Sequence, residues 1–367
     1  MTSSPPAPAR PRRGLRLRDA ALKVASWATT PLLPTDYLDL IDPLRLGSQL
    51  RGRIVARRLE TPDMATLIIR PGRGWQGHVP GQYVRVGVDV NGVRHWRSYS
   101  LTHRADARDG LISISVKRGG RISAYLIDDI APGDLIQLEQ AAGEFVLTAQ
   151  LPAKILFLTA GSGITPILGM LRNSATRGAD VVHVHCGPDA DSLLFGAEIA
   201  LLGAAGTITF KPWHTRERGR IDLTDSAALD DLVPDWRERQ AWVCGPGALL
   251  DAAAELWDQA GCPDALHVER YQAARAAVGE GGVVSFSRSA VAVETDGTTP
   301  LLDAGEEMGV LMPSGCRMGI CFGCCASLTS GSVRDLRTGD VTSAPVDGQI
   351  VVQTCINAAA GPCTVDL

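Results

Sequence analysis

The cysteines near the C-terminus have the spacing with the clearest chemistry. Cys316, Cys321 and Cys324 form a C-x4-C-x2-C pattern, and Cys355 follows after thirty residues. Four thiolates at this spacing hold the two irons of a plant-type [2Fe-2S] centre. Five of the nine cysteines fall within 40 residues, which favours a metal site over a disulfide framework. The sequence therefore predicts an iron-sulfur cluster bound by these four residues.

Two alternatives concern the same cysteines. A structural zinc site normally uses paired C-x2-C or C-x4-C knuckles, whereas here three cysteines lie in nine residues with a distant fourth. Cys325 is an alternative ligand to Cys324, although it would change the spacing to x3. We interpret Cys325 and Cys363 as packing residues.

A second group of residues suits a phosphorylated planar cofactor. Arg97, Tyr99 and Ser100 lie at the end of a predicted strand. A guanidinium can bind a phosphate through two parallel hydrogen bonds, and an aromatic ring can cover a flat cofactor. About twenty residues later, Gly120 and Ser123 end a strand and open a helix, a place where backbone N–H groups can face a pyrophosphate.

A third group is a glycine turn after a predicted buried strand. Gly161 and Gly163 lead into Thr165 and Pro166, and the pattern predicts Thr165 as N-cap and Pro166 as first helical residue. A helix that begins after such a turn is a phosphate site. The turn is not the dinucleotide fingerprint G-x-G-x-x-G, because Pro166 replaces the third glycine.

The motifs R-x-Y-S at Arg97–Ser100, G-x-G-x-T-P at Gly161–Pro166 and C-G-P at Cys244–Pro246 together resemble those of the ferredoxin–NADP reductase superfamily. Residues 283–367, with C-R-x-G-x-C-x-x-C at Cys316–Cys324, resemble a plant-type ferredoxin domain. The resemblance implies FAD rather than FMN, NAD(P)H and a [2Fe-2S] cluster as cofactors.

The resemblance also implies residue roles. Arg97 would bind the flavin phosphate, Tyr99 would lie against the flavin ring and Ser100 near flavin N5, while Cys244 would lie beside the nicotinamide. Tyr271, in the last strand of this part, departs from the commoner Phe. The expected catalytic residues are Ser100, Cys244 and Glu269. The expected cofactor-binding residues are Arg97, Tyr99, Ser100, Val116, Lys117, Gly120, Ser123, Gly161, Gly163, Thr165, Cys244, Gly245, Pro246 and Tyr271.

The choice between NADH and NADPH depends on other residues. The loop Cys186–Asp191 has no arginine to bind a 2'-phosphate, and its carboxylates suit a free ribose hydroxyl, which favours NADH. Charge for a 2'-phosphate could come from another loop, through Arg216, Arg218 and Arg220, but we interpret these residues as a solvated basic patch. His183 and His185 alternate with valines on a predicted inner strand, and we interpret them as satisfied core or cleft residues.

The elements that position these motifs change in type along the chain. Short alternating strands predict an antiparallel FAD-binding β-barrel over 48–150, after an N-terminal extension, 1–47, that is partly disordered. Buried strands then alternate with helices, which predicts a doubly wound parallel α/β NAD(P)-binding domain over 151–272. A linker, 273–282, precedes a β-grasp [2Fe-2S] ferredoxin domain over 283–367.

Composition limits the partners and the location. The net charge of -4 gives no basic field, so we expect no nucleic acid partner. No apolar run reaches the ~18 residues of a membrane-spanning helix. We interpret the basic segment between Arg10 and Lys23 as a solvated tail followed by a packing helix, with a peripheral membrane encounter or an export signal as alternatives. We expect a cytoplasmic protein, with a peripheral position at the inner membrane face as the alternative.

The predicted function is electron transfer from NAD(P)H through FAD to the cluster and then to a terminal oxygenase. From about Thr30 the chain resembles reductase components of oxygenase and fatty-acid desaturase systems, and Pro31–Tyr37 is typical of the desaturase-associated branch. We therefore expect a membrane di-iron fatty-acid desaturase or hydroxylase as acceptor. The alternatives are a cytochrome P450 or ring-hydroxylating oxygenase as acceptor, an iron-sulfur flavoprotein redox sensor, and a structural zinc-flavin adaptor.

Overall fold

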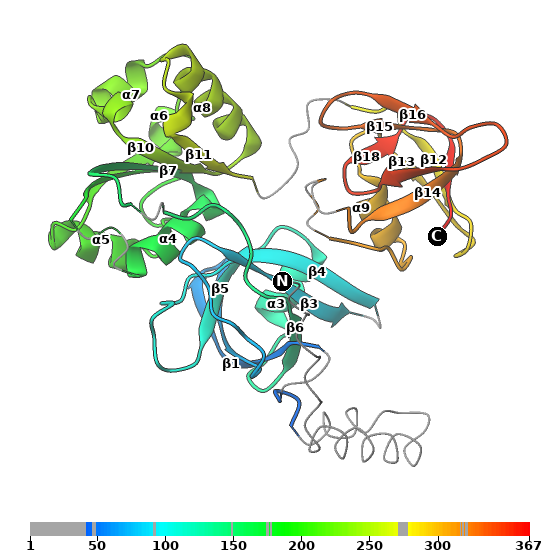
Figure 1. Ribbon diagram of the computed structural model, residues 1–367, viewed down its shortest axis with the longest axis horizontal. Helices are drawn as coiled ribbons and strands as arrows, with labels where there is room; N and C mark the ends of the chain where they lie inside the picture. The colour runs from blue at the N-terminus through cyan, green and yellow to red at the C-terminus, as the bar shows by residue number, and fades with distance from the viewer. Residues whose placement is uncertain are drawn as a thin grey trace, which may run out of the picture.

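In the computed structural model, the chain forms three separate folded units (Figure 1). We call them the barrel domain, the α/β domain and the C-terminal domain, in chain order. The structure describes residues 42–45, 49–90, 93–147, 150–173, 176, 178–270, 278–315, 317, 319 and 322–367.

The barrel domain is a six-stranded antiparallel sheet in the order β4-β3-β6-β1-β2-β5. A bridge between Leu101 and Ile114 joins the two outer strands, so the sheet closes on itself. Helix α3 buries Ile122 and Leu126 against the barrel core. The elements are β1 (Arg51–Thr61), β2 (Met64–Pro71), β3 (Tyr83–Val90), β4 (Val93–Ser100), β5 (Ile112–Lys117), α3 (Arg121–Asp128) and β6 (Leu135–Leu138).

The α/β domain has a five-stranded parallel sheet in the order β11-β10-β7-β8-β9. Both faces of β7 are buried, since Phe157 packs towards α4 and α5 while Leu156 and Leu158 pack towards α7 and α8. Its strands are β7 (Lys154–Ala160), β8 (Asp180–Gly187), β9 (Thr209–His214), β10 (Gln240–Cys244) and β11 (Leu266–Glu269). Its α-helices are α4 (Ile164–Arg172), α5 (Gly196–Ala204), α6 (Thr215–Arg218), α7 (Ala227–Leu232) and α8 (Gly247–Gln259), with short 3-10 turns η1 (Gly161–Gly163), η2 (Trp236–Glu238) and η3 (Pro263–Ala265).

The strand order of this sheet locates its binding edge. The chain runs outward from β7 through β8 to β9, and then returns to place β10 on the other side of β7. In open parallel sheets, ligands bind beyond the carboxyl ends of the strands at such a reversal. The turn Gly161–Gly163 after β7 and Cys244 at the end of β10 both lie at this point.

The C-terminal domain combines a five-stranded sheet, β13-β12-β19-β14-β17, with a three-stranded sheet, β16-β15-β18. Helix α9 packs Leu301 and Leu302 into their common core. This is the expected β-grasp arrangement of strands around one helix. The elements are β12 (Gly282–Phe286), β13 (Val291–Thr295), α9 (Leu301–Glu307), β14 (Cys325–Ser330), β15 (Ser332–Asp335), β16 (Val341–Ser343), β17 (Ile350–Gln353), β18 (Asn357–Ala359) and β19 (Cys363–Val365).

Two details differ from the sequence expectation. Gly279 and Gly281 donate backbone hydrogen bonds to Gly297 and Ala359, so part of the expected linker already belongs to the C-terminal domain. Helix α9 was not among the expected elements, because its seven residues are too few to show a helical period. Within the described residues, no helix is long and apolar enough to span a membrane.

Candidate functional site

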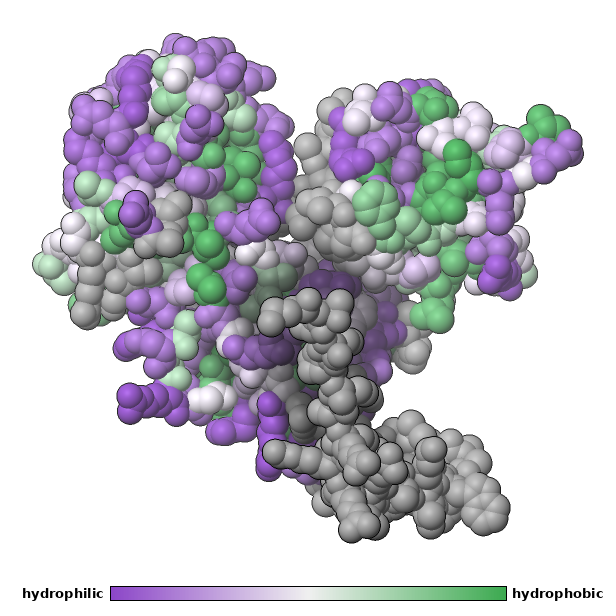
Figure 2. All heavy atoms as spheres, in the orientation of Figure 1, coloured by the Kyte–Doolittle hydropathy of each residue, from purple (hydrophilic) through white to green (hydrophobic). Residues whose placement is uncertain are grey.

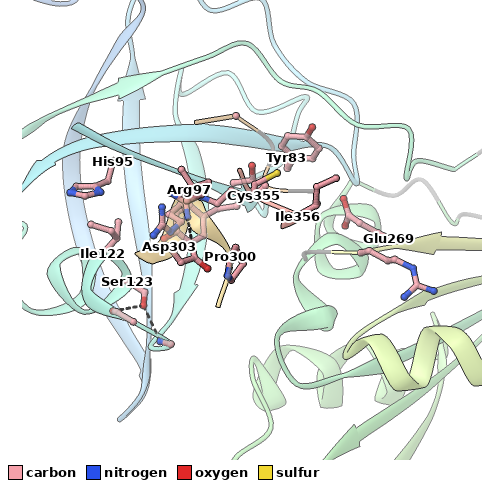
Figure 3. Close-up of a pocket in the computed structure, with 18 of the residues that line it drawn as sticks. Tyr83, His95, Arg97, Ile122, Ser123, Glu269, Pro300, Asp303, Cys355 and Ile356 are labelled. Carbon is pink, nitrogen blue, oxygen red and sulfur yellow. Dashed lines mark hydrogen bonds and ion pairs between the residues drawn. The ribbon is translucent and has the colours of Figure 1, made fainter. Parts of the chain in front are cut away.

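A cavity of about 1100 Å³ lies where the three domains meet. Tyr99 and Ser100 of the barrel domain, Glu269 of the α/β domain and Cys355 of the C-terminal domain all contribute to its wall. Figure 3 shows Arg97, Pro300 and Cys355 on one side of this space and Glu269 on another. The cavity therefore brings together residues of the predicted flavin and cluster sites with Glu269 of the α/β domain. The residues of the glycine turn and of the C-G-P motif are not among those that line it, namely Gly161, Gly163, Thr165, Cys244, Gly245 and Pro246.

Strand β4 places the residues of the R-x-Y-S motif at the cavity. The Arg97 guanidinium donates to the Trp96 carbonyl at 2.9 Å and to Glu306 of the C-terminal domain at 3.5 Å. Burial raises the pKa of the Tyr99 phenol, so the ring stays neutral. Ser100 is 3% exposed at the end of the strand. A guanidinium, a neutral aromatic ring and a buried hydroxyl, in this order along the strand, are suited to binding a flavin and its phosphate.

The turn before α3 contains Gly119 and Gly120, whose backbone a ligand can approach closely. The Ser123 hydroxyl accepts a hydrogen bond from the Gly119 N–H and donates one to the Gly120 carbonyl, each at 2.9 Å. A Cβ atom at Gly119 or Gly120 would meet nothing within 4 Å, so their backbone faces open space. Ser123 thus shapes the turn with its side chain, and the N–H groups at the start of α3 remain the groups suited to a pyrophosphate.

Two of the expected flavin residues lie apart from this group. Val116 is buried in the barrel core, and the Lys117 ammonium lies 3.9 Å from the Asp63 carboxylate. Neither is among the residues that line the cavity.

The glycine turn of the α/β domain differs in detail from its prediction. Gly161–Gly163 form a 3-10 turn, and α4 begins at Ile164 with Gly163 in the N-cap position. Thr165 is therefore inside the first turn, where its hydroxyl donates to the Ser162 carbonyl at 2.9 Å, and it does not cap the helix. The physical reason is that the 3-10 turn runs directly into the helix, so the Ile164 N–H already has carbonyl partners at Gly161 and Ser162.

The predicted nicotinamide residues converge on one edge of the sheet. A Cβ atom at Gly163 would lie 2.0 Å from the Cys244 carbonyl oxygen, so only glycine allows the turn to pack against β10. Cys244 is directly beside Thr159 on one neighbouring strand and beside Glu269 on the other. Gly245 follows in the bend, and Pro246 is in the N-cap position of α8, where its carbonyl accepts hydrogen bonds from the Leu249 and Leu250 N–H groups.

Glu269 is the most strongly perturbed carboxyl of the cavity. Burial raises its pKa from 4.5 to about 8. Its Oε2 atom is buried without a hydrogen-bond partner. A carboxyl of this kind is protonated at neutral pH and can hold a proton beside a bound cofactor.

Two of the four predicted cluster ligands, Cys324 and Cys355, lie in the described part of the chain. The Cys324 and Cys355 sulfur atoms lie 3.1 Å apart, close enough for both to bind one iron. The hydrogen bond with Cys355 is the main reason that the pKa of Cys324 falls to about 6, and the lower pKa favours the thiolate that a metal requires. The other two predicted ligands, Cys316 and Cys321, lie outside the described residues, as does Tyr271.

The cysteine loop has an unusual backbone. Arg317 and Phe322 have φ angles of 59° and 56°, and Gly319 has 74°. Left-handed conformations are costly for non-glycine residues and collect at functional sites. A Cβ atom at Gly319 would also lie 2.6 Å from an Arg337 nitrogen. The loop thus bends sharply between the predicted ligands, and such bends allow several cysteines of one short loop to point at the same cluster.

Cys363, His183 and His185 are buried in the core. Cys363 is buried, and burial raises its pKa to about 11, so it remains a thiol. The Thr159 hydroxyl lies 2.9 Å from His183 Nε2 and 2.8 Å from His185 Nδ1. Burial lowers the pKa of both histidines, that of His185 to about 4, and keeps the rings neutral. Both were interpreted from the sequence as core or cleft residues, and the structure places them in the core.

Sequence reasoning missed a group of charged residues at the cavity. Glu306 of α9 forms ion pairs with Arg97 of the barrel domain and with Arg317 of the cysteine loop, and Arg317 also pairs with Asp303 at 2.8 Å. Arg317 belongs to the C-R-x-G motif and could have been singled out. Glu306 and Asp303 give no sequence signal, because their partners come from distant parts of the chain.

Comparison with protein-family models assigns a family to each domain. Residues 54–147 match an oxidoreductase FAD-binding domain, residues 157–255 an oxidoreductase NAD-binding domain, and residues 286–359 a 2Fe-2S iron-sulfur cluster binding domain. These matches confirm the predicted cofactors and favour iron over zinc. When bound, the flavin accepts a hydride and passes electrons singly, and the cluster carries one electron at a time.

Known proteins share the whole architecture. An NADPH oxidoreductase of Mycobacterium tuberculosis is 46% identical over 95% of this chain and 92% of its own length. The ferredoxin reductase component of a 3-ketosteroid-9-alpha-monooxygenase from Mycolicibacterium smegmatis is 29% identical over 78% of this chain and 88% of its own. Phthalate dioxygenase reductase, at 23% identity, has the same fold, with a TM-score of 0.59 over 87% of this chain and 98% of its own.

The motifs, the three domains and the matches agree with one another. The chain belongs to the ferredoxin–NADP reductase superfamily, and is an NAD(P)H-dependent iron-sulfur flavoprotein oxidoreductase with FAD, a nicotinamide site and a C-terminal [2Fe-2S] domain.

Proposed function

We propose that this enzyme is the reductase component of an oxygenase system, which takes a hydride from NADPH and delivers electrons singly from its cluster to a separate terminal oxygenase. The observation that supports this most is the shared cavity. Cys355, a predicted cluster ligand, lines the same space as Tyr99 and Ser100 of the flavin motif. Electrons can therefore pass between the two cofactors within one chain.

The residues of the cavity suit the two halves of this reaction. Ser100 and Glu269 line the cavity where hydride transfer would occur, and Cys244 lies beside Glu269 on the neighbouring strand. Arg97 and the turn before α3 would hold the phosphates. The chain's task is to hold the nicotinamide against the flavin and to exclude water while the hydride moves. Glu269, protonated at neutral pH, would hold a proton at Oε2 next to the reacting rings.

The environment of Asp189 supports NADPH over NADH. From the sequence, the carboxylates after β8 suited a free ribose hydroxyl. In the structure, the Asp189 carboxylate is ion-paired with Arg216, so it does not offer an isolated negative charge. The Arg218 guanidinium lies 3.8 Å from the centre of the Trp213 ring, beside the same loop. Two arginines here are favourable for a 2'-phosphate, and the Mycobacterium tuberculosis relative is named an NADPH oxidoreductase.

The acceptor class follows from the named relatives. Reductase components of a ketosteroid monooxygenase and of a glycine betaine monooxygenase cover most of this chain, which supports an oxygenase acceptor of that kind. The sequence favoured a membrane desaturase, and none of these relatives carries such a name. The residues on which that expectation rested, Pro31–Tyr37, lie outside the described part of the chain, so a desaturase acceptor stays a prediction.

The C-terminal domain offers apolar surface for a protein partner. Figure 2 shows hydrophobic residues gathered on this domain. Phe322, two residues before the ligand Cys324, is 66% exposed, and Leu311 is 72% exposed. Exposed apolar side chains near the electron exit favour a transient docking contact.

An anaerobic titration tests the central claim. NADPH should bleach the flavin absorbance and then the cluster absorbance of the purified protein, and the reduced protein should rapidly reduce cytochrome c, which a redox sensor would not do. Failure of NADPH to reduce the cluster would contradict the proposal. Turnover with candidate monooxygenases, a P450 and a membrane desaturase, supplied one at a time, then identifies the acceptor class.

The nucleotide preference has its own test. Replacing Arg216 with Ala should raise the KM for NADPH by about tenfold, because a charge-assisted phosphate contact is worth about 1.5–3 kcal/mol, while the KM for NADH changes little. Arg220→Ala, in the same segment, is the matched control. Equal changes for both nucleotides would show that Arg216 does not face a 2'-phosphate.

A further inference from the structure

The C-terminal domain contacts the barrel domain through polar groups. Glu306 Oε2 lies 3.5 Å from Arg97 Nη2, and Glu306 Oε1 lies 3.9 Å from His95 Nδ1. The Arg85 guanidinium donates to the Ser314 carbonyl at 3.5 Å. The core of the C-terminal domain is built from its own residues alone. Among the described residues, these polar contacts therefore help to position the C-terminal domain on the barrel domain.

Glu306 is at the centre of these contacts and is well shielded from water. Its side chain is 10% exposed, against 17% for Arg317 and 30% for Arg97. Charge interactions at such a site are screened less than those at an open surface. Figure 3 shows Arg97 and Asp303 side by side at the cavity wall.

Glu306 also separates two cations. Arg97 belongs to the barrel domain and Arg317 to the cysteine loop, and each of these guanidiniums is ion-paired with Glu306. The proximity of Arg317 is one of the causes that lower the pKa of Arg97, after burial. Without the carboxylate between them, the two like charges would repel each other across the domain boundary.

The same network reaches the cluster loop directly. Arg317 lies next to the predicted ligand Cys316 and is held at its other nitrogen by Asp303. A guanidinium has five donors, so Arg97 can hold Glu306 and a phosphate oxygen of the flavin together. The chain Arg97–Glu306–Arg317 thus connects the flavin phosphate site to the cluster loop.

We propose that Glu306 is a positioning residue that docks the C-terminal domain onto the flavin site, through Arg97 on one side and Arg317 on the other, and so controls the rate of flavin-to-cluster electron transfer. The inference rests on the proposed function. One hydride brings two electrons to the flavin, the cluster carries them one at a time, and two single-electron reductions of the acceptor complete the balance. Docking geometry affects only the steps after the hydride.

Glu306→Gln tests the proposal, since it keeps the side-chain shape and removes the charge. In anaerobic stopped-flow measurements with NADPH, flavin reduction should stay within about twofold of wild type while cluster reduction slows by at least about tenfold, equivalent to 1.4 kcal/mol or more on the barrier. Small-angle X-ray scattering should show a larger radius of gyration. Glu306→Asp should recover part of the rate.

Glu294→Gln is the matched control. It removes the same charge from an exposed residue of β13 in the same domain, outside the lining of the cavity, and it should leave both steps and the radius unchanged.

Three results separate this inference from its alternatives. Normal cluster reduction in Glu306→Gln, alongside a normal wild type, would overturn it. A change in FAD affinity with an unchanged transfer rate would also overturn it, because Glu306 would then act only on the phosphate site. A wild-type cluster that NADPH does not reduce would instead overturn the proposed function.

Discussion

The barrel domain has two neighbours and is joined to them by different kinds of contact. With the α/β domain it shares an apolar core, since Met64 and Phe145 are buried among Phe157, Ile164 and Trp242. With the C-terminal domain it shares the ion pair between Arg97 and Glu306 and the hydrogen bond from Arg85 to the Ser314 carbonyl. We call the contact with the α/β domain the first boundary and the contact with the C-terminal domain the second. Apolar packing stabilises the first boundary, and polar and charged contacts stabilise the second.

Hydrogen bonds strengthen the first boundary further. Arg172 donates to the Thr102 carbonyl at 2.7 Å, Asn173 accepts from the Ala105 N–H at 2.6 Å, and Trp242 donates to the Val146 carbonyl at 3.1 Å. Hydride transfer requires two rings in contact at a fixed distance and angle. Electron transfer to the cluster tolerates a less rigid partner. The difference suggests that each boundary has the stiffness that its own step needs.

Loss of the cluster should have the largest effect and should leave the first boundary intact. Cys324→Ser removes a predicted ligand whose sulfur lies 3.1 Å from that of Cys355. We expect cytochrome c reduction to fall by about a hundredfold or more, while NADPH-driven reduction of ferricyanide, which can take electrons from the flavin, is retained. A parallel loss of both activities would show that the two boundaries are not independent.

Forcing the first boundary apart should have the next largest effect. A Cβ atom at Gly169 in α4 would lie 2.5 Å from the Leu101 carbonyl oxygen of the barrel domain. Gly169→Val should therefore lower the free energy of unfolding by about 3 kcal/mol, measured by urea denaturation, and should slow flavin reduction.

Gly203→Ala is the control for this variant. Gly203 is also in a helix of the α/β domain, and a Cβ atom there meets nothing within 4 Å. Alanine at an open helical position should be neutral or stabilising by up to about 1 kcal/mol. If Gly169→Val unfolds like Gly203→Ala, the boundary is not tightly packed.

Titration of Glu269 should have the smallest effect, confined to the hydride step. Its pKa is raised to about 8, so the folded protein binds more protons than the unfolded chain between pH 4.5 and about 8, and stability falls as the pH rises through this window. Because the carboxyl is partly accessible from the cavity, we expect the free energy of unfolding to fall by only about 1–2 kcal/mol across this pH window. Glu269→Gln should remove this loss and flatten the pH profile of flavin reduction.

The measurement for Glu269 is denaturation and stopped-flow flavin reduction across the pH range, with wild type and variant compared. Cluster reduction by an already reduced flavin should show the same pH profile in both proteins. The raised pKa would be contradicted if the stability and the rate of flavin reduction of the wild type followed the same pH dependence as those of the variant through pH 8.

Much of the site could be predicted from short segments of sequence. Arg97, Tyr99 and Ser100 lie within four residues, and Gly161 and Gly163 form one turn, so local backbone geometry fixes how they act together. The strand limits were predicted well where polar and apolar residues alternate, as in Tyr83–Val90. The position of Thr165 was predicted less well, because a 3-10 turn displaced the start of the helix.

The sequence by itself determined the cofactors, the three domains and their order, because each cofactor motif is a local pattern that sets its own backbone geometry. The tertiary structure decided how these sites meet. Arg97 and Glu306 are 209 residues apart, yet they form the contact between the flavin site and the cluster domain. No local spacing encodes such a pair, because it forms only when two independently packed units bring distant side chains to one boundary.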